Sequence, residues 1–167
     1  DYKLKLALPY GDAVSELLVE TLLSGVGLDL PEFLAKTREQ TVPLSLKFSL
    51  NDQLLLPVLL NYDNKLKAAI QLDTKQKTIY SGHVLVGTGE VAQTEDTGLK
   101  LEINRDRLAL QDWLGLALAH GAGDGIRELK LHSDHALWKK TDIGLLDLSL
   151  KHNDSNWTGV IASPLAK

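Results

Sequence analysis

Cysteine and methionine are both absent from the 167 residues of this chain. Without cysteine, the protein has no disulfide framework, no cysteine–zinc site and no catalytic thiol. Because natural chains normally begin with methionine and this one begins at Asp1, we expect an internal fragment of a longer protein or a processed form. Aromatic residues are also scarce, at 5%, whereas leucine is the most frequent residue type.

A basic excess and long apolar runs are missing as well. The formal net charge is -4, so the chain lacks the basic surface of nucleic-acid-binding proteins, and we expect no nucleic-acid partner. No apolar run approaches the roughly 18 residues of a membrane-spanning helix. Hydrophobic residues at 44% and charged residues at 24% are ordinary for a globular domain, which excludes a disordered chain.

Apolar and polar residues alternate along most of the chain. This period of two is typical of strands with one apolar face, and it favours antiparallel pairing. Short Asx-rich segments at 61–64, 73–75 and 152–155 have the length and composition of hairpin turns. The pattern therefore predicts a mostly β fold with minor α content, an antiparallel meander of consecutive hairpins. Strands are expected over residues 2–8, 44–50, 65–72, 78–86, 99–103, 143–150 and 157–161, with a further strand from residue 129.

Two segments have helical spacing. Asp12 is placed to cap a helix that runs through Val14, Leu17, Leu18, Thr21 and Leu22 and ends at Gly25. A second helix is expected over residues 111–120. Pro57 lies inside the apolar run 54–60, where it would remove a ladder hydrogen bond, and it predicts an edge or bulged strand.

A glycine-rich stretch at 121–125 is the expected joint between two parts of the chain. Residues 1–120 form the larger, helix-containing β part. Residues 126–167 form a C-terminal β repeat unit, which we expect to continue the same sheet.

Candidate catalytic and metal-binding patterns are weak. In the cluster His132-Ser133-Asp134-His135, a strand places only His132 and Asp134 on one face, short of the three or four ligands that zinc needs. No Gly-x-Ser-x-Gly elbow is present, and the glycines from Gly82 to Gly89 do not have phosphate-loop spacing. The carboxylate pairs Glu102 with Asp106 and Asp142 with Asp147 are better explained as solvated groups. We expect no enzyme activity, no metal and no cofactor.

The leucine-rich alternation leaves two interpretations open. One is the closed core of a β-sandwich. The other is a sheet whose apolar face stays open as a groove for acyl chains, which would leave more apolar surface than a monomer normally exposes.

Three sets of motifs, in this order, resemble the YhdP family, the very large AsmA-like proteins of Gram-negative envelopes. The first is Leu28-Asp29-Leu30-Pro31 with Lys36 and Pro43-Leu44. The second is Gly98-Leu99-Lys100-Leu101 followed by Asp112-Trp113, and the third is Leu129-Lys130-Leu131 with Ile143-Gly144 and Trp157 to Ser163-Pro164. The likeness covers most of the chain from Gly25 to Lys167.

This resemblance implies a fold and a function. The family looks like bridge-type lipid transporters, in which a long curved β-sheet carries an apolar groove and an N-terminal helix anchors the parent protein in the inner membrane. It implies a periplasmic location, phospholipid acyl chains and neighbouring repeats of the parent chain as partners, and a role in lipid transport to the outer membrane and its permeability barrier. No catalytic residues belong to this family pattern.

The expected groove lining comes from two strands with strict alternation. The candidates are Leu44, Leu46, Phe48, Leu50, Leu99, Leu101 and Ile103. Two alternatives stay open, a structural or interaction module without ligand and an enzyme that uses the region of His132 and Asp134. Because the edge strands of an excised sheet have unpaired backbone groups, we also expect some self-association through these edges.

Overall fold

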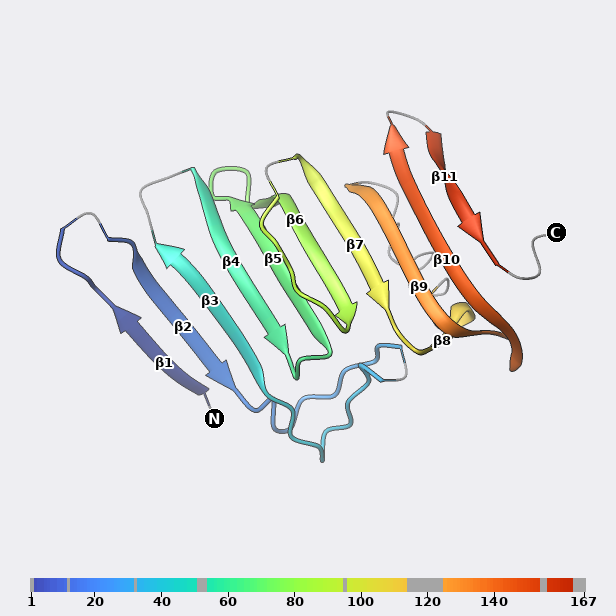
Figure 1. The fold of residues 1–167 in the computed structure, drawn as a ribbon. Helices are drawn as coiled ribbons and strands as arrows, with labels where there is room; N and C mark the ends of the chain where they lie inside the picture. Colours follow the sequence, from blue (N-terminus) through green and yellow to red (C-terminus); the bar gives the residue numbers. More distant parts are fainter. Residues whose placement is uncertain are drawn as a thin grey trace.

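The computed structural model describes residues 2–11, 13–31, 33–50, 54–94, 96–113, 125–153 and 156–163. Within these residues, eleven strands form one sheet that lies as a single open layer (Figure 1). The mostly β prediction is confirmed. The strands are β1 (Tyr2–Ala7), β2 (Ser15–Thr21), β3 (Leu44–Leu50), β4 (Leu55–Tyr62), β5 (Leu66–Asp73), β6 (Thr78–Gly87), β7 (Gly98–Asn104), β8 (Arg107–Ala109), β9 (Ile126–Trp138), β10 (Thr141–Asn153) and β11 (Asn156–Ala162).

The strand order is β1-β2-β3-β4-β5-β6-β7-β9-β10-β11, with β8 paired to β9. Pairing is antiparallel from β1 to β6 and again from β9 to β11. Strand β7 pairs in parallel with both β6 and β9. The prediction of an uninterrupted series of hairpins is therefore wrong at β7, since parallel neighbours need a crossover connection rather than a tight turn.

The register places most of the apolar residues of the long strands on one side of the sheet, with exceptions such as Leu18, Leu59 and Leu85 on the other. Directly paired residues point to the same side, and residues two apart on a strand do so as well. One row, for example, joins Leu46 to Val19 on one side and to Leu60 on the other. We call this side the apolar face. It carries Leu4, Leu6, Leu17, Val19, Leu44, Leu46, Phe48, Leu50, Val58, Leu60, Tyr62, Leu66, Ala68, Ile70, Val84, Val86, Leu99, Leu101, Ile103, Leu129, Leu131, Leu148, Leu150 and Ile161.

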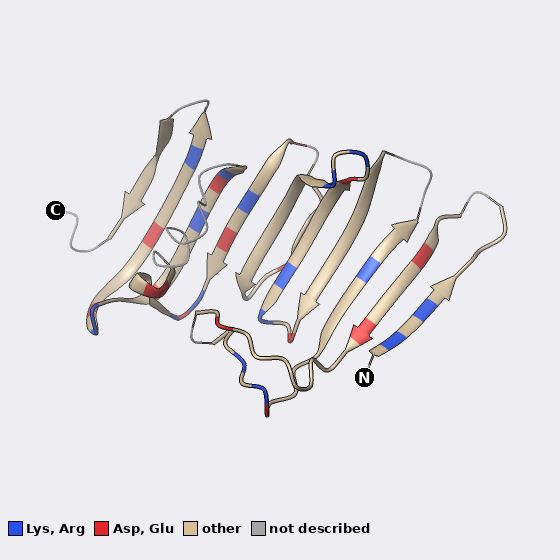
Figure 2. Cartoon of the chain, turned by 180° about the vertical axis from the view of Figure 1, so that it is seen from behind, with Lys and Arg blue, Asp and Glu red and all other residues tan. Residues whose placement is uncertain are grey.

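The opposite side, the polar face, carries charged and hydroxyl side chains at the alternate positions. Charged residues occur along β1, β2, β3, β5, β7, β9 and β10 (Figure 2). Cross-strand ion pairs join neighbouring strands there, such as Lys5 with Glu20 at 3.0 Å and Lys47 with Glu16 at 2.8 Å. Opposite charges on adjacent strands support the register, although exposed pairs of this kind contribute little free energy.

The connection between β2 and β3, residues 22–43, packs against one end of the apolar face and lies at the lower end of the strands in Figure 1. Its Leu34 and Val42 are buried with Tyr62, Val86 and Ile103 of the sheet. Burying a leucine-sized side chain stabilises a fold by about 1.5–3 kcal/mol. We call this part of the apolar face the covered end, because a second layer of chain closes it.

A second connection returns along the polar face. Residues 88–94, which we call the strap, follow β6 and lead back toward the start of β7 (Figure 1). The backbone carbonyl of Thr94 accepts a hydrogen bond from Ser81 Oγ on β6 at 3.0 Å, and the carbonyl of Gly89 accepts one from Lys67 Nζ on β5 at 2.9 Å. This return path gives β7 the same direction as β6.

The predicted helix from Val14 to Leu22 is wrong, because this segment forms strand β2. Its apolar residues Leu17 and Val19 meet Phe48 and Leu46 across the ladder to β3. Gly25 does not end a helix but takes a positive φ of 77° in a turn. For the second predicted helix, a helical turn occupies residues 110–113, and the rest of 111–120 lies outside the described residues.

Strand β4 is neither an edge strand nor bulged, so the interpretation of Pro57 is also wrong. The strand lies between β3 and β5 with continuous register to both. Its pairing with β3 stops at Phe48 opposite Val58, one residue before Pro57 is reached. A central strand tolerates proline here because the ladder on that side has already ended.

Strands β9, β10 and β11 belong to the same sheet as the rest of the chain. Most of the expected glycine-rich joint lies outside the described residues. No helix in the described ranges is long and apolar enough to cross a bilayer.

Candidate functional site

The apolar face outside the covered end is the most extensive candidate site. Strands make substantial contacts only with their hydrogen-bonded neighbours, so no second sheet formed by the described residues packs on this face. Side chains near its margins are exposed, with Leu4 and Leu6 at 57%, Leu50 at 38% and Ile161 at 60%. Leu46 and Phe48 are half-buried, as expected for side chains that contact their neighbours within the sheet.

The seven predicted lining residues all lie on the apolar face, but in different surroundings. Strands β3 and β7 are not adjacent, because β4, β5 and β6 separate them. Ile103 is 3% exposed in the core of the covered end, and Leu44 and Leu101 pack against that core. The other four lie outside it and are half-buried or exposed; these are Leu46, Phe48, Leu50 and Leu99.

Local sequence patterns do not identify the middle of this face. These patterns predict a helix at Leu17 and Val19. They predict an edge or bulged strand for the residues of β4, and only a loosely alternating strand for those of β5. In the sheet, Val58 and Ile70 join Phe48 in one continuous row. The register of each strand with its neighbour is the signal that links these residues, and it exists only in three dimensions.

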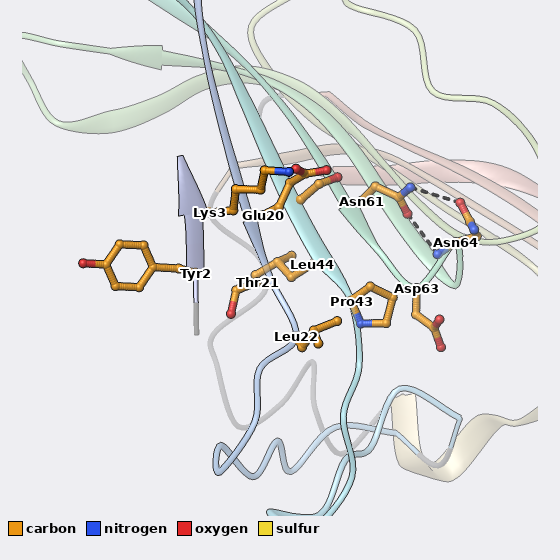
Figure 3. Close-up of a pocket in the computed structure, with 11 residues that line it drawn as sticks. Tyr2, Lys3, Glu20, Thr21, Leu22, Pro43, Leu44, Asn61, Asp63 and Asn64 are labelled. Atoms are coloured by element: carbon orange, nitrogen blue, oxygen red, sulfur yellow. Dashed lines mark hydrogen bonds between the residues drawn. The ribbon is translucent and has the colours of Figure 1, made fainter. Parts of the chain in front are cut away.

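Two surface hollows are lined largely by residues of the polar face. One of about 480 Å³ lies where β1 and β3 begin and β2 and β4 end, and Lys3, Glu20 and Asn61 line it (Figure 3). Asn61 holds the following turn by two hydrogen bonds to Asn64, of 3.0 and 2.9 Å. Another of about 300 Å³ includes Lys130 and His132. Both hollows are shallow. The hydroxyl of Ser149 lines the second one together with the paired His132 and Asp147, but His132 hydrogen-bonds Asp147 and not Ser149.

The histidine cluster bridges strands and does not gather ligands. His132 hydrogen-bonds Asp147 of β10 through Nδ1, and this bond raises the pKa of His132. His135 pairs instead with Asp142, at 3.0 Å. The pKa of Asp142 is lowered, chiefly by the backbone N–H of Gly144 and then by His135. Within the described residues, no group of three or more histidine or acidic side chains is arranged to hold a metal ion.

The other sequence candidates also have structural explanations. The glycines from Gly82 to Gly89 belong to strand β6 and the turn that follows it. Glu102 lies 2.9 Å from Lys100, and the hydrogen bond from Lys100 is the main cause of the lowered pKa of Glu102. Glu102, Asp142 and Asp147 each have a lysine or histidine partner.

Comparison with protein-family models, with curated proteins and with solved structures finds no match for this chain. The two faces of the sheet differ in the chemistry that they offer to a ligand. A broad uncharged surface built from leucine, valine and isoleucine binds hydrocarbon through the hydrophobic effect, with about 0.8 kcal/mol for each methylene removed from water.

Proposed function

We propose that this chain is a segment of a periplasmic β-groove protein that binds phospholipid acyl chains and conducts them between the inner and outer membranes. In this proposal, it supports the permeability barrier of the outer membrane. The parent protein is anchored in the inner membrane, and neighbouring repeats extend the face. The motif resemblance to the YhdP family supplies the lipid class and the location.

The observation that carries the proposal is a continuous row of apolar side chains from Leu4 on β1 to Leu150 on β10, flanked by parallel rows of which one reaches Ile161 on β11. Charged side chains are absent from the row residues that define this face, whereas lysine and acid pairs lie on the opposite side. Since each methylene contributes a similar free energy wherever it lies, an acyl chain on such a face is held without a single tight position. That property suits movement along a conduit.

The experiment is native mass spectrometry of the purified chain, with organic extraction and identification of co-purified lipid. We expect stoichiometric phospholipid on the wild-type chain. The double variant Leu46→Asn/Phe48→Asn places two polar amides on the half-buried part of the apolar face. It is expected to lose the lipid while circular dichroism shows an intact β fold.

The matched control is Ser45→Asn/Ser49→Asn, which introduces the same side chains on the same strand but on the polar face. This variant should retain the lipid. A wild-type chain that stays free of lipid after incubation with excess phospholipid vesicles contradicts the proposal. Equal lipid loss in both double variants does so as well.

The covered end favours a second candidate for part of the molecule, a structural module without ligand. There, Leu34 and Val42 already occupy the apolar surface that a lipid would need. A wild-type chain that binds no lipid, and whose free energy of unfolding is the same with and without phospholipid vesicles, would assign the whole chain to this second function.

A further inference from the structure

His83 lies between the sheet and the strap, and it is almost completely buried. Its side chain projects from β6 on the polar face and is 6% exposed. The backbone N–H of Ala92 in the strap donates a hydrogen bond to His83 Nδ1 at 3.3 Å. Because Nδ1 accepts this bond, the ring carries its proton on Nε2 and is neutral.

The other ring nitrogen faces a carboxylate on the next strand. His83 Nε2 lies 3.4 Å from Glu102 Oε2, too poorly aligned for a hydrogen bond, and it is otherwise without a partner among the described residues. The same oxygen is only 2.9 Å from Lys100 Nζ. The Glu102 carboxylate is therefore close enough to pair with a charged imidazole, although the neutral ring makes no hydrogen bond to it.

Charged groups from four elements surround this ring. Lys100 and Glu102 face it from β7, and Glu128 acts on it from β9. Lys67 of β5, which pairs in the ladder with Leu85, forms an ion pair of 3.4 Å with Glu90 of the strap. Burial lowers the pKa of His83 from 6.5, with Lys100 acting in the same direction and the two glutamates against it.

We propose that His83 is a pH-sensitive latch that holds the strap on the polar face when its ring is neutral and releases it when its ring is protonated. A proton on Nδ1 turns that atom into a donor, so it faces the Ala92 N–H with no acceptor between them. Once the strap lifts away, the imidazolium is no longer buried, and it can regain water and pair with Glu102.

Release of the strap changes what the polar face presents. Leu85 is fully buried on this face, and Ala69 is 2% exposed. Gly89 of the strap lies directly on Leu85, because a Cβ at Gly89 would come within 3.0 Å of that side chain. Opening therefore uncovers Leu85, a buried apolar side chain on a face that carries most of the charged groups of the strands. This inference does not depend on the proposed lipid function.

Hydrogen exchange of the wild-type chain, read by mass spectrometry at pH 7.5 and pH 5.0, tests the latch. Exchange times are scaled for the intrinsic chemical rate at each pH. Below the ordinary histidine pKa of 6.5, the opening equilibrium of residues 88–94 should rise by up to about tenfold for each pH unit, until the pKa of the closed state is passed. Peptides from β3 and β4 should keep their protection.

Two variants separate His83 from the other titratable groups. His83→Asn keeps an acceptor near the position of Nδ1 but does not titrate, so the strap should stay protected at pH 5.0. Glu90→Gln removes the carboxylate that contacts Lys67, and this variant should still release the strap in acid. Unchanged protection of the wild-type strap at pH 5.0, or acid release in His83→Asn equal to that of the wild type, overturns the proposal.

A direct titration keeps the test decisive if His83→Asn does not fold. Nitrogen NMR of the wild-type imidazole reports the Nε2–H tautomer at neutral pH and the pH at which His83 gains its second proton. That midpoint should coincide with the midpoint of strap release. A strap that opens while His83 is still neutral rules the latch out.

Discussion

The phenolic O–H of Tyr62 on β4 donates a hydrogen bond of 3.0 Å to the backbone carbonyl of Leu34, which joins the sheet to the connection that covers it. Both residues are buried, with exposed fractions of 5% and 2%. Burial also raises the pKa of Tyr62, in line with a hydroxyl that keeps its proton.

Tyr62→Phe should reduce the free energy of unfolding by about 1–3 kcal/mol, because the carbonyl of Leu34 loses its donor without gaining water. Urea denaturation measures this value. Tyr80→Phe is the control, since Tyr80 is 38% exposed and a surface change of this kind should stay within about 0.5 kcal/mol. Equal effects of the two variants would show that the bond does not hold the covered end.

Truncations should distinguish the covered end from the rest of the apolar face. Ile103→Ala is expected to cost about 2–5 kcal/mol, since it opens a cavity in a closed core. Leu46→Ala should cost only about 1 kcal/mol, because Leu46 is half-buried. Urea denaturation of both variants gives the comparison. Similar losses would indicate that the whole face is closed.

The alternation of single strands could be predicted from the sequence, because a period of two depends only on neighbouring residues. The segment 15–21 has a misleading helical pattern, because Leu17 and Leu18 lie next to each other and Val14 and Thr21 complete a helical spacing. As strand β2, it buries Leu17 against Phe48 on the apolar face and leaves Leu18 on the other. Pairing with β3 outweighs the local pattern.

The candidate site was predictable as a face but not in its extent. Leu46 and Ile103 have the same alternating surroundings in the sequence, yet one is half-buried and the other is closed over. The difference comes from Leu34, which is distant in the chain and has no local signal that it will cover Ile103. The direction of β7 was equally hidden, since parallel and antiparallel strands share the same period.

The ion pair of His132 with Asp147 should make stability depend on pH in the opposite sense to His83. The hydrogen bond raises the pKa of His132 above 6.5 in the folded state. Its contribution is therefore fully present below pH 6.5 and is lost as the pH rises through the raised value. Both side chains are nearly half exposed, so solvent limits it to a few tenths of a kcal/mol.

The measurement is the free energy of unfolding at pH 5.5 and pH 8.5 for the wild type, His132→Gln, Asp147→Asn and the double variant. Each single variant should lower the difference in unfolding free energy between pH 5.5 and pH 8.5 by the same amount. The double variant should lower this difference by no more than either single variant. Independent losses that add in the double variant would show that the two residues are not coupled.

Gly159→Ala should loosen the last strand of the sheet. A Cβ at this position would overlap the carbonyl oxygen of Ser149 and come within 2.8 Å of the Leu150 Cα. Since backbone atoms cannot rotate away, β11 must shift, and we expect a loss of about 1–3 kcal/mol with faster amide exchange in β11. Thr158→Ala, on the neighbouring residue, should have little effect. Unchanged exchange in Gly159→Ala would contradict the close approach of β11 to β10 at this position.

Lysines on the first strand should limit association through that edge. All residues of β1 are exposed, and its outer ladder is unpaired among the described residues. Antiparallel pairing of two β1 strands about Leu4 would place Lys3 opposite Lys5, which like charge disfavours. Lys3→Thr/Lys5→Thr should therefore increase self-association in sedimentation velocity, most clearly at low salt. Identical sedimentation of variant and wild type would exclude this edge as the contact.

The direction of β7 also sets the order in which the chain folds. Two antiparallel meanders, β1 to β6 and β9 to β11, meet only through this strand, and both of its ladders are parallel. Hairpins close in about 1–10 μs, whereas pairings between distant segments must first close a longer loop. The meanders should therefore form first, and insertion of β7 between them should be the slow step. Until that step, β6 and β9 are both unpaired edges, and the half-folded chain is then most exposed to aggregation.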